Sequence, residues 1–221
     1  MAYIRRMEDR QTSQARPVPP RAGRQMLLFA GGIIGFIVLA AGVFLVSDRF
    51  AAKTAGGFPA LQDYQFRLID QRGAARTPNQ FIGRPVALFF GFTYCPDVCP
   101  TTLMTLAAAR DSLAKQGVDT SALQILFVTV DPARDTPEQL SQYLSMFDDD
   151  VTGLTGSREE IISVLRQFGI YAKKVDQGNG DYSFDHSAAV FLYHDNGRFK
   201  GTIVHNEPIE FIVQKLKSIL S

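Results

Sequence analysis

Thr93-Tyr94-Cys95-Pro96-Asp97-Val98-Cys99-Pro100 contains both cysteines of the chain, with three residues between them. The seven residues before it, 86–92, form an apolar run that predicts a buried strand, and the pattern from about residue 100 to residue 116 predicts a helix. The two thiols therefore fall at a strand-to-helix junction. In α/β folds, ligand-binding and catalytic residues commonly lie at this edge of the sheet.

A proline follows each cysteine, and this sets the expected local backbone. The residue before a proline is disfavoured in α geometry, whereas proline itself is tolerated in the first turn of a helix. We therefore expect Cys95 and Cys99 on a turn at a helix N-terminus, where free N–H groups and the helix dipole favour the thiolate form. Spacing alone leaves a structural disulfide, a metal site or a redox couple open. A disulfide closing so short a loop would remove little chain entropy and contribute little stability.

Residues 26–46 form an uninterrupted apolar stretch that predicts a transmembrane anchor. A helix of that length, rising 1.5 Å per residue, crosses a hydrocarbon core of about 30 Å. A cleaved signal peptide is the alternative, but its apolar region is usually about 7 to 15 residues long. Six arginines and two acidic residues precede the span, so residues 1–25 are expected in the cytoplasm or the mitochondrial matrix. The rest then lies in the bacterial periplasm or the mitochondrial intermembrane space.

The segment 51–221 has the size of one compact domain with a real core. Short β-branched or aromatic runs alternate with helical patterns, which predicts an α/β sandwich with a partly parallel sheet. Capping signals at Thr136 and Ser157 each predict a helix start, and Gly178-Asn179-Gly180 predicts a turn. The chain has a net charge of +1 and its basic residues are scattered, so we expect no nucleic-acid partner. Expected strands cover 64–69, 86–92, 123–130, 188–193 and 199–204, and a last helix starts at 209.

This order of elements resembles the thioredoxin fold, and three stretches narrow the resemblance to the Sco/SenC family. They are Gly91 to Pro100, Val130-Asp131-Pro132-Ala133-Arg134-Asp135-Thr136-Pro137, and Asp185-His186-Ser187. The resemblance implies a thioredoxin-like sandwich with a central mixed sheet behind a single N-terminal anchor in the inner membrane. It also implies a copper-binding protein that helps to build the copper centre of cytochrome c oxidase. Its partner would be the copper-site subunit of that oxidase or another copper chaperone.

By the same resemblance, Cys95, Cys99 and His186 match the copper ligands of the family. Thiolate sulfur is soft and suits Cu(I), and an imidazole nitrogen completes a site that also tolerates Cu(II). The residues alone divide the histidine role between His186, before the strand 188–193, and His205, after the strand 199–204. His194 adjoins the predicted turn at residues 195–197 and is expected to be a solvated turn residue.

Two functions from different classes follow from these residues. In the first, a metallochaperone holds copper through Cys95, Cys99 and His186 and hands it to a partner, with no net turnover of a small substrate. In the second, a thiol–disulfide oxidoreductase attacks a partner disulfide with Cys95 and resolves the mixed disulfide with Cys99. A peroxidase of the same fold is a weaker third reading. Asp131 is expected to start a turn, and the alternative is that Asp131 or Asp185 orients a ligand.

Overall fold

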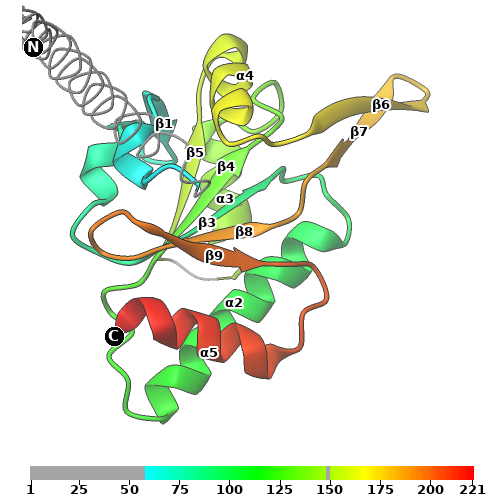
Figure 1. Cartoon of the computed structure of the whole chain (residues 1–221). Coiled ribbons are helices and arrows are strands. Elements are labelled where there is room, and N and C mark those ends of the chain that lie inside the picture. Colours follow the sequence, from blue (N-terminus) through cyan, green and yellow to red (C-terminus); the bar gives the residue numbers. More distant parts are fainter. Residues whose placement is uncertain (1–57, 148–149) are drawn as a thin grey trace, which may run out of the picture. The chain divides into compact units, whose positions relative to one another are not determined.

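The structure, a computed structural model, describes residues 58–147 and 150–221 of the chain. These residues belong to one compact unit and form a mixed sheet of seven strands in the order β2-β1-β5-β4-β3-β8-β9 (Figure 1). At its centre, β3 (Val86–Gly91), β4 (Gln124–Thr129) and β5 (Val151–Thr155) run parallel. The expectation of a partly parallel sheet is confirmed.

Antiparallel strands flank this parallel centre on both sides. β1 (Leu68–Asp70) pairs with β5, and β8 (Val190–Tyr193) pairs with β3. The other elements of the described residues are η1 (Leu61–Asp63), β2 (Ala75–Arg76), η2 (Pro78–Phe81), α2 (Val98–Lys115), α3 (Pro137–Leu144), α4 (Arg158–Gln167), β6 (Ala172–Gly178), β7 (Asp181–His186), β9 (Phe199–Ile203) and α5 (Ile209–Leu220).

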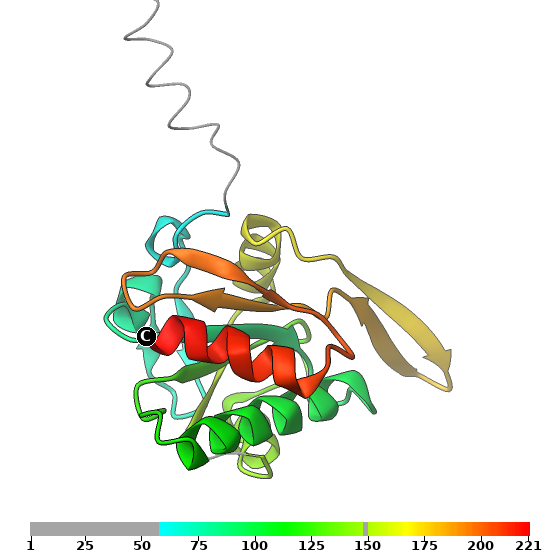
Figure 2. The same cartoon turned by 60° about the horizontal axis from the view of Figure 1, so that its bottom comes forward.

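The alternation of side chains along β3 divides the core into two layers. Ala87 and Phe89 pack with apolar residues of α2, α3 and α5 on one face of the sheet. Leu88 and Phe90 pack with residues of η1 and α4 on the other face. Figures 1 and 2 show α2 and α5 side by side against the first face. Every residue of β3 is buried, because helices cover both faces of the sheet at its centre.

Two helices begin where their capping signals predicted. At α3, the Thr136 side chain accepts a hydrogen bond from the Gln139 N–H (3.3 Å). At α4, Ser157 and Glu160 exchange hydrogen bonds in a capping box. The helix after the cysteines starts at Val98, slightly before the predicted start, so Cys99 already lies in its first turn.

Several strand predictions differ from the structure. The strand expected at 64–69 begins only at Leu68, because Tyr64 ends η1 and stacks its ring on Phe168 at 3.7 Å. The strand expected from 188 begins at Val190, and β5 was not predicted.

The largest difference is a hairpin that the sequence analysis did not predict as strands. β6 and β7 form a separate two-stranded sheet that projects from the domain (Figure 2). The turn predicted at Gly178-Asn179-Gly180 is confirmed as the connection, with φ of 81°, 55° and 82° at its three residues. This hairpin ends at His186 and thereby positions that side chain.

The membrane prediction falls on residues that the structure does not describe. Among residues 58–147 and 150–221, no helix combines the length and apolar character needed to cross a bilayer. The expected anchor at 26–46 and the tail at 1–25 lie outside the described residues.

Candidate metal centre

The two cysteines lie on a tight turn between β3 and α2. The Cys95 N–H donates a hydrogen bond to the Phe92 carbonyl (3.2 Å), and the Cys99 N–H donates to the Sγ atom of Cys95 (3.4 Å). Both residues are free cysteines; Cys99 is fully buried and Cys95 is half-buried. The first turn of α2 therefore directs a backbone donor at Cys95, as expected for a thiol at a helix N-terminus.

His186 approaches this turn from the end of β7. Its Nε2 atom lies 3.8 Å from the Sγ atom of Cys99, and its Nδ1 atom lies 2.8 Å from the Ser187 carbonyl oxygen. A carbonyl oxygen only accepts hydrogen bonds, so in the neutral ring Nδ1 carries the proton and the lone pair is on Nε2. The imidazole therefore presents its free nitrogen to the cysteine turn.

The three residues named from the sequence converge in the structure. One ligand atom from each of Cys95, Cys99 and His186 lies within 4.8 Å of the other two. Bond lengths of about 2.0–2.3 Å, as at zinc sites with the same ligand types, separate two ligands of one ion by up to about 4.6 Å. Small side-chain adjustments would thus bring all three atoms onto one ion. Two thiolates with an imidazole form a set that favours soft metals.

The protonation of the cysteine pair is asymmetric. A hydrogen bond from Cys99 lowers the pKa of Cys95 to about 4, and backbone hydrogen bonds from residues 97 and 99 also lower it. The pKa of Cys99 is raised, because its proton is held by Cys95, its side chain is buried, and the nearby Cys95 thiolate repels a second negative charge. Cys95 is therefore a thiolate at neutral pH while Cys99 keeps its proton until an ion or base displaces it.

Asp135 supports the start of the cysteine turn, a role that the sequence analysis did not assign. Its carboxylate is fully buried and accepts hydrogen bonds from Thr93, through both the N–H (3.1 Å) and the Oγ1 hydroxyl (2.6 Å). The Thr129 hydroxyl also donates to it (2.5 Å). Burial raises the pKa of Asp135, although these donors oppose the shift. Its position in the quoted stretch 130–137, four residues after Asp131 at the same sheet edge, was the signal available for it.

Gly91 is a second residue that the sequence analysis left without a role. A Cβ atom at Gly91 would lie 2.7 Å from the Phe127 ring and 2.8 Å from the Sγ atom of Cys99. The missing side chain thus allows Cys99 to pack directly against the end of β3.

Asp131 starts the predicted turn, since its carbonyl oxygen accepts hydrogen bonds from the N–H groups of Arg134 (3.2 Å) and Asp135 (3.0 Å). Its side chain accepts a hydrogen bond from the Tyr182 hydroxyl of β7 (3.0 Å) and pairs with Arg134. Asp185 is exposed on β7. The carboxylate of Asp131 therefore contacts the hairpin that carries His186.

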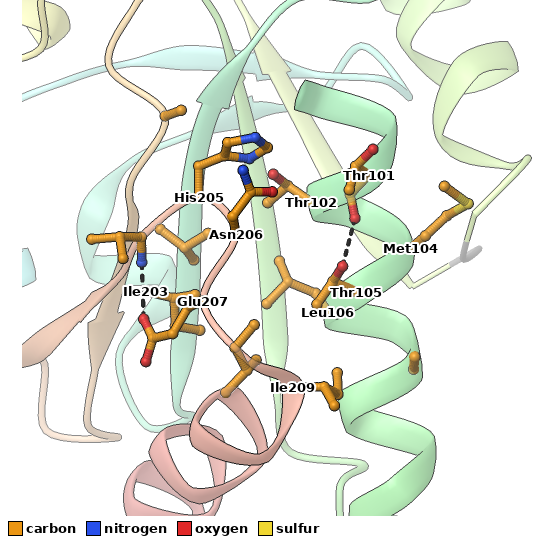
Figure 3. Close-up of a pocket in the computed structure, with 15 residues that line it drawn as sticks. Thr101, Thr102, Met104, Thr105, Leu106, Ile203, His205, Asn206, Glu207 and Ile209 are labelled. Atoms are coloured by element: carbon orange, nitrogen blue, oxygen red, sulfur yellow. Dashed lines mark hydrogen bonds between the residues drawn. The ribbon is translucent and has the colours of Figure 1, made fainter. Parts of the chain in front are cut away.

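The other two histidines lie elsewhere. His205 is exposed on the loop after β9, where it extends toward Thr102 of α2 and lines a pocket of about 470 Å³ (Figure 3). His194 takes part in the turn between β8 and β9, where it accepts a backbone hydrogen bond from Gly197 (2.9 Å) and is half-buried. Within the described residues, the cluster of possible metal-ligating groups contains His186 and neither of these histidines.

The fold and the cluster define a class: thioredoxin-like α/β domains in which two thiols and one imidazole converge beside a helix N-terminus. A model of the SCO1/SenC family matches residues 55–221. The chain belongs to this family, as the resemblance of its three sequence stretches implied.

Similar sequences and a similar solved structure are consistent with this family membership. The chain is 36% identical over 156 residues to Protein sco1 of Schizosaccharomyces pombe, covering 69% of this chain and 59% of that protein. It is 41% identical over 143 residues to Protein SCO1 homolog 1, mitochondrial, of Arabidopsis thaliana, covering 64% and 40%. The match thus spans only about half of the length of these relatives. Bradyrhizobium japonicum ScoI, solved with copper bound, aligns with a TM-score of 0.64 at 38% identity, covering 71% of this chain and 98% of that one.

Proposed function

We propose that this protein is a membrane-anchored copper chaperone that binds copper through Cys95, Cys99 and His186. The observation that carries the proposal is the convergence of these three ligand atoms within 4.8 Å. Membership of the SCO1/SenC family and the copper-bound structure of a relative support the choice of metal. The cargo is delivered to the copper centre of cytochrome c oxidase during its assembly, either to the copper-site subunit or through another copper chaperone.

The arrangement suits a carrier that must also release its ion. Cys95 is half-buried and already a thiolate, so an incoming copper ion meets it first, whereas Cys99 is buried behind it. Binding to Cys99 releases a proton, because only the thiolate is a ligand. Three protein ligands leave a coordination position at which a partner's ligand can bind before Cys95, Cys99 and His186 are displaced one at a time.

The membrane part of the proposal comes from the sequence. The apolar stretch 26–46 anchors the chain, with the tail 1–25 in the cytoplasm or matrix and the copper-binding domain in the periplasm or the intermembrane space. A fusion of alkaline phosphatase, which is active only after export, to the C-terminus should be active in bacterial cells. An inactive fusion at normal expression would contradict this orientation.

Copper release from His186→Ala tests the ligand assignment. The His186→Ala variant of the full chain is purified in detergent with reductant and loaded with one equivalent of Cu(I). It should lose copper to a competing chelator about tenfold faster than the wild type, because one ligand is missing. His205→Ala is the matched control, since His205 is exposed and lies outside the cluster. Unchanged copper retention in His186→Ala, or an equal loss in His205→Ala, would contradict the proposal.

A second function, thiol–disulfide exchange, is favoured by the unequal exposure of the two cysteines. The Cys95 thiolate would attack a partner disulfide, forming a mixed disulfide and releasing one partner thiolate. Cys99, after losing its proton, would attack the Cys95 sulfur, releasing the second partner thiolate and leaving a Cys95–Cys99 disulfide. Such a protein keeps the cysteines of a partner copper site reduced.

Two variants, Cys99→Ala and His186→Ala, separate the two functions. Cys99→Ala should trap a mixed disulfide with an oxidised partner if exchange is the function, because the resolving thiol is missing. His186→Ala should leave exchange largely intact while it impairs copper binding. Loss of copper binding without any trapped mixed disulfide would favour the chaperone alone.

A further inference from the structure

Arg134 lies at the contact between the cysteine turn and the β6–β7 hairpin. The Cζ atom of its guanidinium is 4.5 Å from the ring centroid of Tyr94, the neighbour of Cys95. The same atom is 3.8 Å from the ring centroid of Tyr182 on β7 and 6.0 Å from that of Phe92. The planar cation is thus held against rings from both regions, an arrangement that guanidinium groups favour.

Arg134 is also fixed by its polar contacts. Its Nε atom pairs with Asp131, whose side chain is almost completely buried, and its Nη1 atom lies 3.3 Å from the exposed Asp181 side chain of β7. The Nη2 atom is buried and, within the described residues, has no hydrogen-bond partner. The Tyr182 hydroxyl donates to the second oxygen of Asp131 (3.0 Å). Aromatic faces therefore occupy the position where this end of the guanidinium would otherwise find water.

The alternating pattern of β7 connects this contact to the metal centre. Tyr182, Phe184 and His186 are two residues apart and lie on the same face of the strand. The Phe92 ring, just after β3, packs edge-on against both Phe184 and His186 at 5.7 Å between centroids. A row of aromatic contacts thus runs from the Arg134 guanidinium to the imidazole.

The hairpin needs these contacts because it pairs with no other strand of the described residues. A two-stranded ribbon by itself is marginally stable in water, and the position of His186 follows that of the ribbon. From Tyr182 to His186 the strand covers about 13 Å, at roughly 3.3 Å per residue. A rotation of the ribbon about its attachment would therefore move the imidazole and the Tyr182 ring together.

We propose that Arg134 is a positioning residue, which clamps Tyr182 of the hairpin to Tyr94 of the cysteine turn. It thereby keeps His186 close enough to Cys99 for both side chains to bind one ion. This inference rests on the proposed function, because it assigns Arg134 a role in copper retention through His186. We call Arg134 with Asp131, Tyr94 and Tyr182 the Arg134 clamp. Removing the guanidinium leaves the sulfur ligands in place and lets the third ligand leave the site more often.

Hydrogen exchange of the metal-free full chain in detergent tests the clamp without copper. In Arg134→Gln, the amides of β6 and β7 should exchange about tenfold faster, whereas those of β3 and β4 should keep their rates. Arg198→Gln removes the same charge from an exposed turn and is the matched control. Tyr94→Leu keeps the pairing of Arg134 with Asp131 and should give a smaller, about threefold, increase. Unchanged exchange of the hairpin in both Arg134→Gln and Tyr94→Leu would overturn the clamp.

A double-mutant cycle with copper tests whether Arg134 acts through His186. Arg134→Gln should release Cu(I) faster than the wild type, and the Cu(II)-loaded protein should lose part of the spectroscopic signature of nitrogen ligation. The double variant with His186→Ala should release copper no faster than His186→Ala alone. Additive losses would overturn the positioning role. If His186→Ala alone retains copper, the proposed function fails, while the exchange experiment still decides whether the clamp exists.

Discussion

The cysteine turn and the β6–β7 hairpin supply the ligands of one cluster but are held in different ways. Cys99 lies in the first turn of α2, packed against buried residues of the central sheet, whereas His186 ends a ribbon that projects from the domain (Figure 1). A cooperative core opens only at a high free energy, whereas a weakly packed segment opens locally at a much lower free energy. The two sulfurs thus form a rigid pair, while the imidazole belongs to a part of the protein that can move away. In the proposed function, the cysteine turn is the fixed part of the copper site, and the hairpin is the part at which release begins.

The largest effect is expected from Gly91→Ala, which strains the rigid region. The added Cβ would meet the Phe127 ring and the Cys99 sulfur, both fully buried, so neither can shift easily. Overpacking of this kind costs about 1–3 kcal/mol of unfolding free energy. The resistance of the protein to unfolding by urea and its retention of copper should both decrease. Gly153→Ala is the control: its Cβ would meet Leu144 and Leu140, so it should affect stability but not copper. Intact copper retention in a destabilised Gly91→Ala would show that the sulfur geometry adapts.

A second effect concerns the charge of the cysteine pair. Because the hydrogen bond from Cys99 is the main cause of the lowered pKa of Cys95, Cys99→Ala should move that pKa upward. Alkylation of Cys95 followed by mass spectrometry reports the change as the pH of half-maximal reaction, which we expect near 4 for the wild type. His205→Ala should leave this midpoint unchanged. A midpoint that stays near 4 in Cys99→Ala would assign the lowered pKa to the backbone donors at the helix N-terminus.

The buried Asp135 should make the cysteine turn sensitive to pH. Burial raises the pKa of Asp135 in the folded protein above that of the unfolded chain. The folded state then binds the proton more tightly, so the contribution to stability is present below about pH 4 and is lost as pH rises through the raised pKa. Asp135→Asn removes the titrating group, and the unfolding free energy of the metal-free protein should then fall less between pH 4 and 8. Parallel pH profiles for both proteins would contradict this.

The smallest effect is expected from Lys174→Ala in the hairpin. The Nζ atom of Lys174 lies 3.3 Å from the ring centroid of Tyr182, on an exposed surface. The global unfolding free energy should change by less than about 0.5 kcal/mol, as for most surface substitutions. Hydrogen exchange of β6 and β7 should nevertheless rise about twofold. Equal changes in the hairpin and in β3 would mean that the two regions open together, which would contradict the comparison above.

The cysteine turn was predictable from the sequence because its determinants are local. The apolar run 86–92 and the prolines after both cysteines place a buried strand, a turn and a helix start in order. The hairpin was missed because most residues of β6 are exposed and polar, so the strand lacks the apolar alternation of a half-buried sheet. Its position depends on contacts with Phe92 and Arg134, which are distant in sequence. The residues alone therefore did not separate His186 from His205; the family resemblance did.

The hydrogen bond between Nδ1 of His186 and the carbonyl of Ser187 joins adjacent residues, so it does not depend on how the hairpin is seated. This local contact fixes the tautomer of the ring and much of its direction relative to the adjacent backbone. The direction of the imidazole nitrogen and its distance from the cysteines are thus set separately. The neighbouring peptide group fixes the direction, and docking of the ribbon on the domain sets the distance. A ribbon that opened and closed again, as the proposed clamp implies, would therefore bring back an imidazole already oriented for binding an ion.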